Sequence, residues 1–104
     1  MSLPAKKWLR WFVSAAADLD DIVEHIAKDK PKAALRFARK IKTRVELLRL
    51  SPYVGARCAE HPRVRYLVHG KYMIYYTVHR SEVVIRAVLH GSRRSQFHWL
   101  RRRQ

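Results

Sequence analysis

Acidic residues are scarce in this chain. Only eight of its 104 residues are Asp or Glu, against 23 Lys or Arg, and the formal net charge is +15. Such a balance favours a polyanion or an acidic protein as partner and disfavours association with a second copy of the chain. No acid follows Glu82. The positive charge is therefore strongest in the C-terminal third.

Cysteine is also nearly absent, and so are long apolar runs. Cys58 is the single cysteine and no Cys/His cluster has zinc-ligand spacing, which argues against a disulfide framework and a structural metal. We expect no cofactor, and a packing role for Cys58. No apolar run approaches the roughly 20 residues of a membrane span, and the N-terminus lacks the apolar region of a signal peptide. We therefore expect a cytoplasmic protein without membrane contact.

The first half of the chain reads as a strand followed by two helices. Residues 7–13 are short and rich in aromatic and branched side chains, which predicts a strand, and Ser14 is placed to cap a following helix. Pro31 is expected to begin a second helix, and Ser51-Pro52 to end it before an irregular loop over 52–62. Each helix has one apolar stripe, so the two should form a hairpin. The stripes are Leu19, Ile22, Val23, Ile26 and Ala27, then Ala34, Phe37, Ala38, Ile41, Val45 and Leu48.

The segment from Arg65 to Arg93 predicts strands joined by tight turns. If Arg80-Ser81 is a two-residue turn, antiparallel pairing sets Tyr75 opposite Arg86 and Lys71 opposite His90. Alternation then gives an apolar face toward the helices: Tyr72, Ile74, Tyr76, Val78, Val83, Ile85, Ala87 and Leu89. The other face is expected to be an open cationic and aromatic surface: Lys71, Met73, Tyr75, Thr77, His79, Val84, Arg86, Val88 and His90.

A second turn at Gly70-Lys71 would extend both faces. It places Val64, Tyr66 and Val68 on the open face, and Arg65 and Leu67 on the helix side. The fold class is therefore α+β: an N-terminal strand and a two-helix hairpin on a small, mainly antiparallel sheet of three to four strands. We expect one domain over 1–104, with 95–104 as a basic C-terminal tail.

Several short motifs follow one another along the chain: Ala17-Asp18-Leu19, Ile22, Pro31, Ala34, Leu48, Pro52-Tyr53-Val54-Gly55, Arg65, Tyr72-Met73-Ile74-Tyr75-Tyr76 and Val88-Leu89-His90-Gly91-Ser92-Arg93. In this order they are similar to the motifs of the ParE branch of the RelE/ParE toxin superfamily. The resemblance covers about residues 7–94, and its specificity lies in the order and spacing of motifs that are individually short. It implies a RelE/ParE-like fold and a toxin of a bacterial type II toxin–antitoxin pair. The implied partner is a ParD-like antitoxin with an acidic C-terminal segment, in a heteromeric complex.

Two activities occur in that superfamily, and a few residues favour one of them. Where RelE-like ribonucleases carry cations this chain has Val64, Tyr66 and Met73, and Trp99 stands where they carry a tyrosine; Arg93 alone matches. A ribonuclease needs cations at the phosphate and a group that moves a proton. The resemblance therefore favours a ParE-like inhibitor of DNA gyrase that docks on its target without catalytic residues. A ribosome-dependent mRNA endoribonuclease, or a non-toxic nucleic-acid-binding module, are the alternatives.

Six residues are candidates for contact with the target or the antitoxin: Tyr75, Arg86, His90, Arg93, Arg94 and Trp99. Each also has a structural interpretation. Tyr75 and Trp99 are large enough to cover apolar surface, His90 is placed to bond within a turn, and an arginine pair is often simply solvated. Arg65 is expected first as a salt bridge to an acid of the first helix and second as a binding residue.

Overall fold

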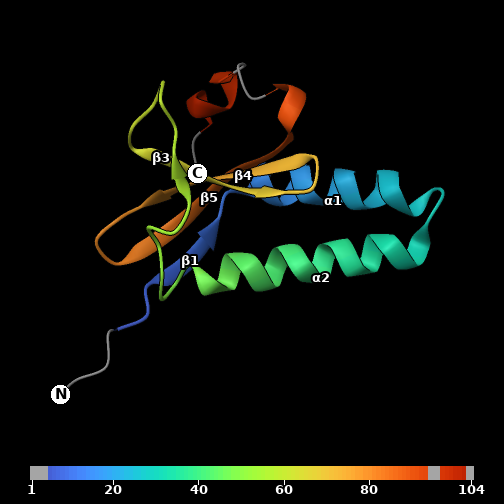
Figure 1. Ribbon diagram of the computed structural model, residues 1–104, viewed down its shortest axis with the longest axis horizontal. Coiled ribbons are helices and arrows are strands. Elements are labelled where there is room, and N and C mark those ends of the chain that lie inside the picture. Colours follow the sequence, from blue (N-terminus) through green and yellow to red (C-terminus); the bar gives the residue numbers. More distant parts are fainter. Residues whose placement is uncertain (1–4, 94–96, 103–104) are drawn as a thin grey trace.

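The computed structural model describes residues 5–93 and 97–102 and shows a helical hairpin packed on a sheet (Figure 1). The order of elements is β1 Trp8–Trp11, α1 Val13–Ala27, α2 Pro31–Leu47, β2 Ala56–Arg57, β3 Val64–His69, β4 Tyr72–Val78 and β5 Glu82–His90. Two short 3-10 helices follow, η1 Gly91–Arg93 and η2 Phe97–Arg101. The predicted α+β class is confirmed. Within the described residues, no helix is both long and apolar enough to cross a bilayer.

The sheet has five strands in the order β1-β5-β4-β3-β2, so the expectation of three to four strands was wrong. β1 runs parallel to β5, and the other neighbours are antiparallel. The strand missed in the sequence is β2, which lies inside the predicted loop over 52–62. Its two residues pair with Arg65 and Tyr66 of β3. Two residues are too few for an alternating pattern to be visible. The mixed sheet places β5, which carries Arg86, between β1 and β4.

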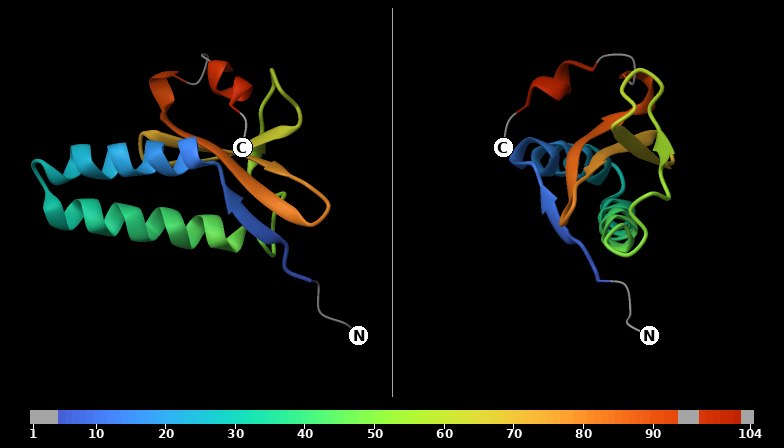
Figure 2. Two further views of the ribbon diagram at one scale, coloured as in Figure 1. Left: turned by 180° about the vertical axis from the view of Figure 1, so that it is seen from behind. Right: turned by 90° about the vertical axis from the view of Figure 1, so that its left-hand side faces the viewer.

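The helical hairpin is confirmed, with one change at its start. Pro31 begins α2 as predicted, but α1 begins at Val13 with Phe12 in the capping position, and Ser14 lies inside the helix. Phe12 is itself buried and belongs to the main core, so packing decides where the helix begins. This core lies between the hairpin and one face of the sheet (Figure 2). It includes Ala15, Leu19, Ile41, Val45, Leu48, Leu67, Ile74, Tyr76, Val83 and Ile85.

A β-bulge changes the pairing of β4 with β5. The predicted turn at Arg80-Ser81 is correct, and the His79 N–H donates to the Glu82 carbonyl over 2.8 Å. The register then shifts between Tyr75 and Tyr76, so Tyr75 lies opposite Ala87 instead of Arg86. The extra residue of the bulge is Arg86. Arg86 has no partner in β4, because a bulge leaves one residue unpaired.

The shift exchanges the two faces of β5 beyond the bulge. Val88 packs in the main core under the helices, whereas Ala87 and Leu89 lie with the cluster on the opposite face, the reverse of the prediction. His90 likewise pairs with Tyr72 and not with Lys71. One inserted residue has this effect because side chains alternate with a period of two.

The turn at Gly70-Lys71 is confirmed, since His69 pairs with Tyr72 across it. Gly70 has a φ of +59°, the region that favours glycine and suits a two-residue hairpin turn. β3 therefore has the predicted orientation. Leu67 is in the main core, while Val64 packs on the other face.

The face predicted to be open is covered by a second apolar cluster. Its buried members are Cys58, Val64, Met73, Tyr75, Ala87 and Trp99. Trp99 lies on η2, and the centroid of its ring is 4.8 Å from the centroid of the Tyr75 ring. Both side chains are only 1% exposed. The C-terminal segment thus folds back on the sheet, on the side away from the hairpin (Figure 2).

Candidate functional site

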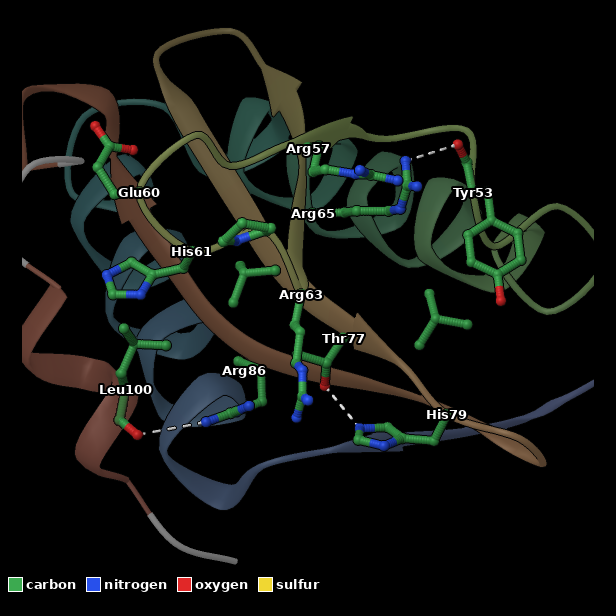
Figure 3. A pocket seen from close by; sticks show the side chains of 13 residues that line it. Tyr53, Arg57, Glu60, His61, Arg63, Arg65, Thr77, His79, Arg86 and Leu100 are labelled. Carbon is green, nitrogen blue, oxygen red and sulfur yellow. Dashed lines mark hydrogen bonds between the residues drawn. The ribbon is translucent and has the colours of Figure 1, made fainter.

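A cavity of about 830 Å³ opens beside this second cluster, and we call it the cationic pocket (Figure 3). The loop before β3, the end of β4, the bulge of β5 and η2 all contribute to it. Its walls are formed by Tyr53, Arg57, Glu60, His61, Pro62, Arg63, Val64, Arg65, Thr77, Val78, His79, Arg86 and Leu100. Four arginines therefore face one cavity, although they are far apart in the sequence.

The arginines of the cationic pocket have little neutralising charge. Glu60 is the one acid in its lining, and its Oε2 accepts a hydrogen bond from the Cys58 thiol over 3.5 Å. The ion pairs of Arg10, Arg49 and Arg102 lie outside the pocket, and none of its four arginines forms an ion pair within the described residues. The pocket is thus strongly positive.

Arg65 occupies one wall with Arg57 directly opposite it across the β2–β3 pair. Arg65 Nη1 donates to the main-chain carbonyls of Tyr53, over 3.2 Å, and Gly55, over 2.9 Å. Its guanidinium also lies 5.1 Å from the centroid of the Tyr53 ring. The predicted salt bridge from Arg65 to an acid of the first helix was therefore wrong. The neighbouring loop carbonyls take the place of the acid.

Arg86 enters the pocket from the bulge. Its Nη2 donates to the Leu100 carbonyl over 3.5 Å, and its guanidinium lies 4.8 Å from the centroid of the Phe12 ring. Burial lowers the pKa of Arg86, and the positive charge of Arg10 lowers it further. Its Nε is buried and finds no hydrogen-bond partner within the described part of the chain. A half-buried cation of this kind is suited to an incoming anion.

Arg63 and two histidines complete the lining. Figure 3 shows Arg63 extending across the pocket toward Thr77 and Arg86. Thr77 Oγ1 lies 2.9 Å from His79 Nε2, and His61 is on the opposite side of the cavity. Sequence reasoning identified Arg65 and Arg86 but missed Arg57, Arg63 and His61 as site residues. The available signal was the density of basic residues in 57–63, most of which falls in the predicted loop over 52–62.

The other predicted site residues do not join this pocket. His90 is exposed at the far end of β5, where its Nδ1 accepts from the Ser92 N–H over 3.1 Å and its ring meets Tyr72 edge to face. The expected role of His90 in a turn is therefore confirmed, and its role in binding stays a prediction. Arg93 ends η1 at the same end of the sheet. Arg94 lies outside the described residues.

Tyr75 and Trp99 are placed where no partner can reach them without unfolding of η2. The expectation that Tyr75 lies on an open face was wrong, and the alternative that both rings cover apolar surface is confirmed, because the two rings bury each other. Arg102 secures the segment: it forms a bidentate pair with Asp18, at 2.7 and 3.1 Å. Asp18 also accepts the Val88 N–H over 3.0 Å. Trp99 is thus packed against the sheet, and Arg102 is paired beside it.

The chemistry available at the site is anion binding. No group of three or more His, Cys, Asp or Glu residues is arranged to hold a metal ion in the part of the chain that the structure describes. Burial is the main cause that raises the pKa of the Cys58 thiol, which keeps it protonated and weakly nucleophilic. The four arginines and two histidines instead present donors to a phosphate or a carboxylate.

Comparisons with known proteins agree with this architecture. A family model described as the ParE toxin of the type II toxin–antitoxin system parDE matches residues 9–95. A Sinorhizobium fredii protein, Y4kP, which bears a provisional toxin name, is 36% identical over 89 residues, or 84% of this chain and 91% of that protein.

Two solved structures share the fold. A chain from a chromosomal ParDE toxin–antitoxin system of P. aeruginosa has a TM-score of 0.72 and 28% identity, over 82% of this chain and 96% of that one. A chain of the RelBE2 toxin–antitoxin complex from Mycobacterium tuberculosis has a TM-score of 0.58 and 21% identity, over 86% of this chain and 97% of that one. At that identity the second comparison supports the fold alone.

Proposed function

We propose a target for this chain, which belongs to the ParE family of toxins in type II toxin–antitoxin systems. The proposed target is DNA gyrase. The toxin would act by docking on gyrase and its DNA, without a catalytic group. Gyrase as target extends the resemblance noted in the sequence. The same proposal places the protein in the cytoplasm, which contains the proposed target and keeps a thiol such as that of Cys58 reduced.

The observation that carries the docking mechanism is the second apolar cluster. Val64, Met73 and Trp99 stand where RelE-like ribonucleases keep cations and a tyrosine, and all three are buried. A scissile phosphate cannot reach a surface that is packed and apolar, and these side chains move no proton. This face of the sheet therefore has a packing role, and the cationic pocket beside it supplies the docking surface.

The partner proposed for this toxin is a ParD-like antitoxin whose acidic segment offsets part of the +15 charge. The P. aeruginosa relative comes from a ParDE system, which supports a partner of that class. Leu35 and Leu47 on α2 are more than half exposed and offer apolar surface to an amphipathic segment. The toxin and antitoxin would form a heteromeric complex by hydrophobic burial and charge complementarity.

A supercoiling assay tests gyrase as target. Purified full-length protein should block supercoiling of relaxed plasmid and cause cleaved DNA to accumulate, because docking traps the enzyme after it cuts. The product of an adjoining antitoxin gene should reverse both effects. Normal supercoiling at a large excess of folded protein would contradict the proposal.

A ribosome-dependent ribonuclease is the second candidate, and one observation favours it. His61 and His79 line the same cavity as the arginines, and histidine is the usual general base. The test is cleavage of message in a translating extract. Cleavage that His61→Gln or His79→Gln abolishes would replace gyrase inhibition as the function, and intact message would leave the docking mechanism standing.

A further inference from the structure

The cationic pocket combines three features that one kind of ligand explains. The first is a concentration of positive charge on arginines that lie close together. Arg57 and Arg65 are direct cross-strand partners, and like charges in that position destabilise a sheet. Arg63 and Arg86 line the same cavity, and no ion pair relieves any of the four among the described residues. An anion lying between them would remove this repulsion.

The second feature is an aromatic rim. Tyr53 is 63% exposed, and the guanidinium of Arg65 lies 5.1 Å from the centroid of its ring. Stacked aromatic and guanidinium groups are the surfaces on which proteins receive unpaired bases. A carboxylate would use the arginines but would gain little from this ring.

The third feature is the size and shape of the cavity. Its volume of about 830 Å³ lies within the range of about 300–1,000 Å³ that is usual for small-ligand sites. A concave site of this size suits a nucleotide of an unpaired strand, whose base is free to leave the stack. Arg86 is only partly buried and lines the same cavity, so its guanidinium adds a donor to the same ligand.

We propose that the cationic pocket binds a single-stranded segment of DNA, with its arginines on the phosphates and Tyr53 beneath a base. The inference rests on the proposed function in one respect: DNA opened and cut by gyrase is the source of such a strand. It deepens that function, because the toxin would then hold the cleaved DNA directly as well as the enzyme.

The test is the binding of a fluorescent single-stranded oligodeoxynucleotide to the full-length protein over a range of salt concentrations. Arg57 and Arg63 are exposed and their side chains form no hydrogen bond within the described residues, so the double variant R57Q/R63Q, which leaves the main-chain pairing of β2 intact, should stay folded. Each lost phosphate contact lowers the log–log salt slope by about 0.7, so the double variant should lose about 1.4. Tyr53→Ala should weaken binding by about tenfold with little change in slope.

A matched control is available on the helical hairpin. Arg36 and Arg39 are exposed on α2, and R36Q/R39Q removes the same charge away from the pocket. That variant should keep the slope and affinity of the unaltered protein. Equal slopes for R57Q/R63Q and the unaltered protein would overturn the inference. So would pocket-dependent binding of polyglutamate that the oligonucleotide fails to displace.

The gyrase assay run in parallel separates the two proposals. If the unaltered protein blocks supercoiling and R57Q/R63Q binds the oligonucleotide equally well, the strand site is wrong and the gyrase proposal stands. If binding depends on the pocket but supercoiling is normal, gyrase is the wrong target and the strand site stands.

Discussion

At the residue scale, one tyrosine shows how the chain holds the loop beside the cationic pocket. The Tyr76 hydroxyl donates to the Pro52 carbonyl over 2.8 Å and accepts from the Gly55 N–H over 2.9 Å. Burial is the main cause that raises the pKa of Tyr76, so the phenol keeps the proton that it donates. A Cβ on Gly55 would lie 2.4 Å from the hydroxyl and 2.8 Å from the Tyr66 carbonyl oxygen. Only glycine allows this approach.

Replacement of Tyr76 by phenylalanine is expected to lower the free energy of unfolding by about 1–3 kcal/mol. The reason is that the buried Gly55 N–H loses its acceptor and the Pro52 carbonyl loses its donor. Urea unfolding followed by tryptophan fluorescence measures the change. Tyr72→Phe is the control, since the Tyr72 hydroxyl has no hydrogen bond within the described residues, and it should cost less than about 0.5 kcal/mol. Equal effects of the two substitutions would contradict the assignment.

At the element scale, η2 decides which face of the sheet is available. It brings Trp99 onto Tyr75, while the Arg102–Asp18 pair fixes its end near β5. The basic tail expected over 95–104 therefore includes a packed element. A stretch this basic is usually solvated, and Trp99 is buried because it packs on the distant apolar surface of β3, β4 and β5.

Trp99→Ala is expected to cost about 3–5 kcal/mol of unfolding free energy, because it removes a buried ring from a packed cluster. Trp8 offers a matched control in the same chain. It is 72% exposed, so Trp8→Ala should change stability by less than about 0.5 kcal/mol. Thermal and urea unfolding of both variants make the comparison. Similar losses for the two would mean that η2 does not hold the second cluster together.

At the scale of the whole molecule, the net charge of +15 is a destabilising term shared by all elements. Eight acids are too few to balance 23 cations, and the described residues show ion pairs at Arg10, Arg49 and Arg102. Folding brings these cations closer together than they are in the unfolded chain. Repulsion is thus a cost of the compact state that an anionic partner or dissolved salt reduces.

The stability of the isolated toxin should rise with salt. Between about 0.01 M and about 0.1 M salt the screening length falls from about 30 Å to about 10 Å, which weakens repulsion across the molecule. Each kcal/mol gained should raise the melting temperature by about 4–8 °C for a domain of this size. Thermal unfolding at several sodium chloride concentrations measures the effect. A melting temperature that falls with salt would show that the ion pairs outweigh the repulsion.

Local patterns determined much of the fold. The period of the apolar residues and Pro31 predicted the helical hairpin, and Gly70 predicted the turn between β3 and β4, because each signal depends on neighbouring residues only. Short motifs in order also led to the correct family. The same reasoning excluded a disulfide framework and expected a basic surface for an acidic partner.

The tertiary structure alone decided where that surface lies. The bulge at Arg86 reversed the faces of β5, and η2 covered the face that alternation had left open. The cationic pocket unites Arg57 of β2 and Arg63 of the following loop with Arg86 of β5 and with Leu100 of η2. A bulge and a distant covering segment are chosen by packing between residues far apart in the chain. No local period records such a choice, so the site became visible only in the folded protein.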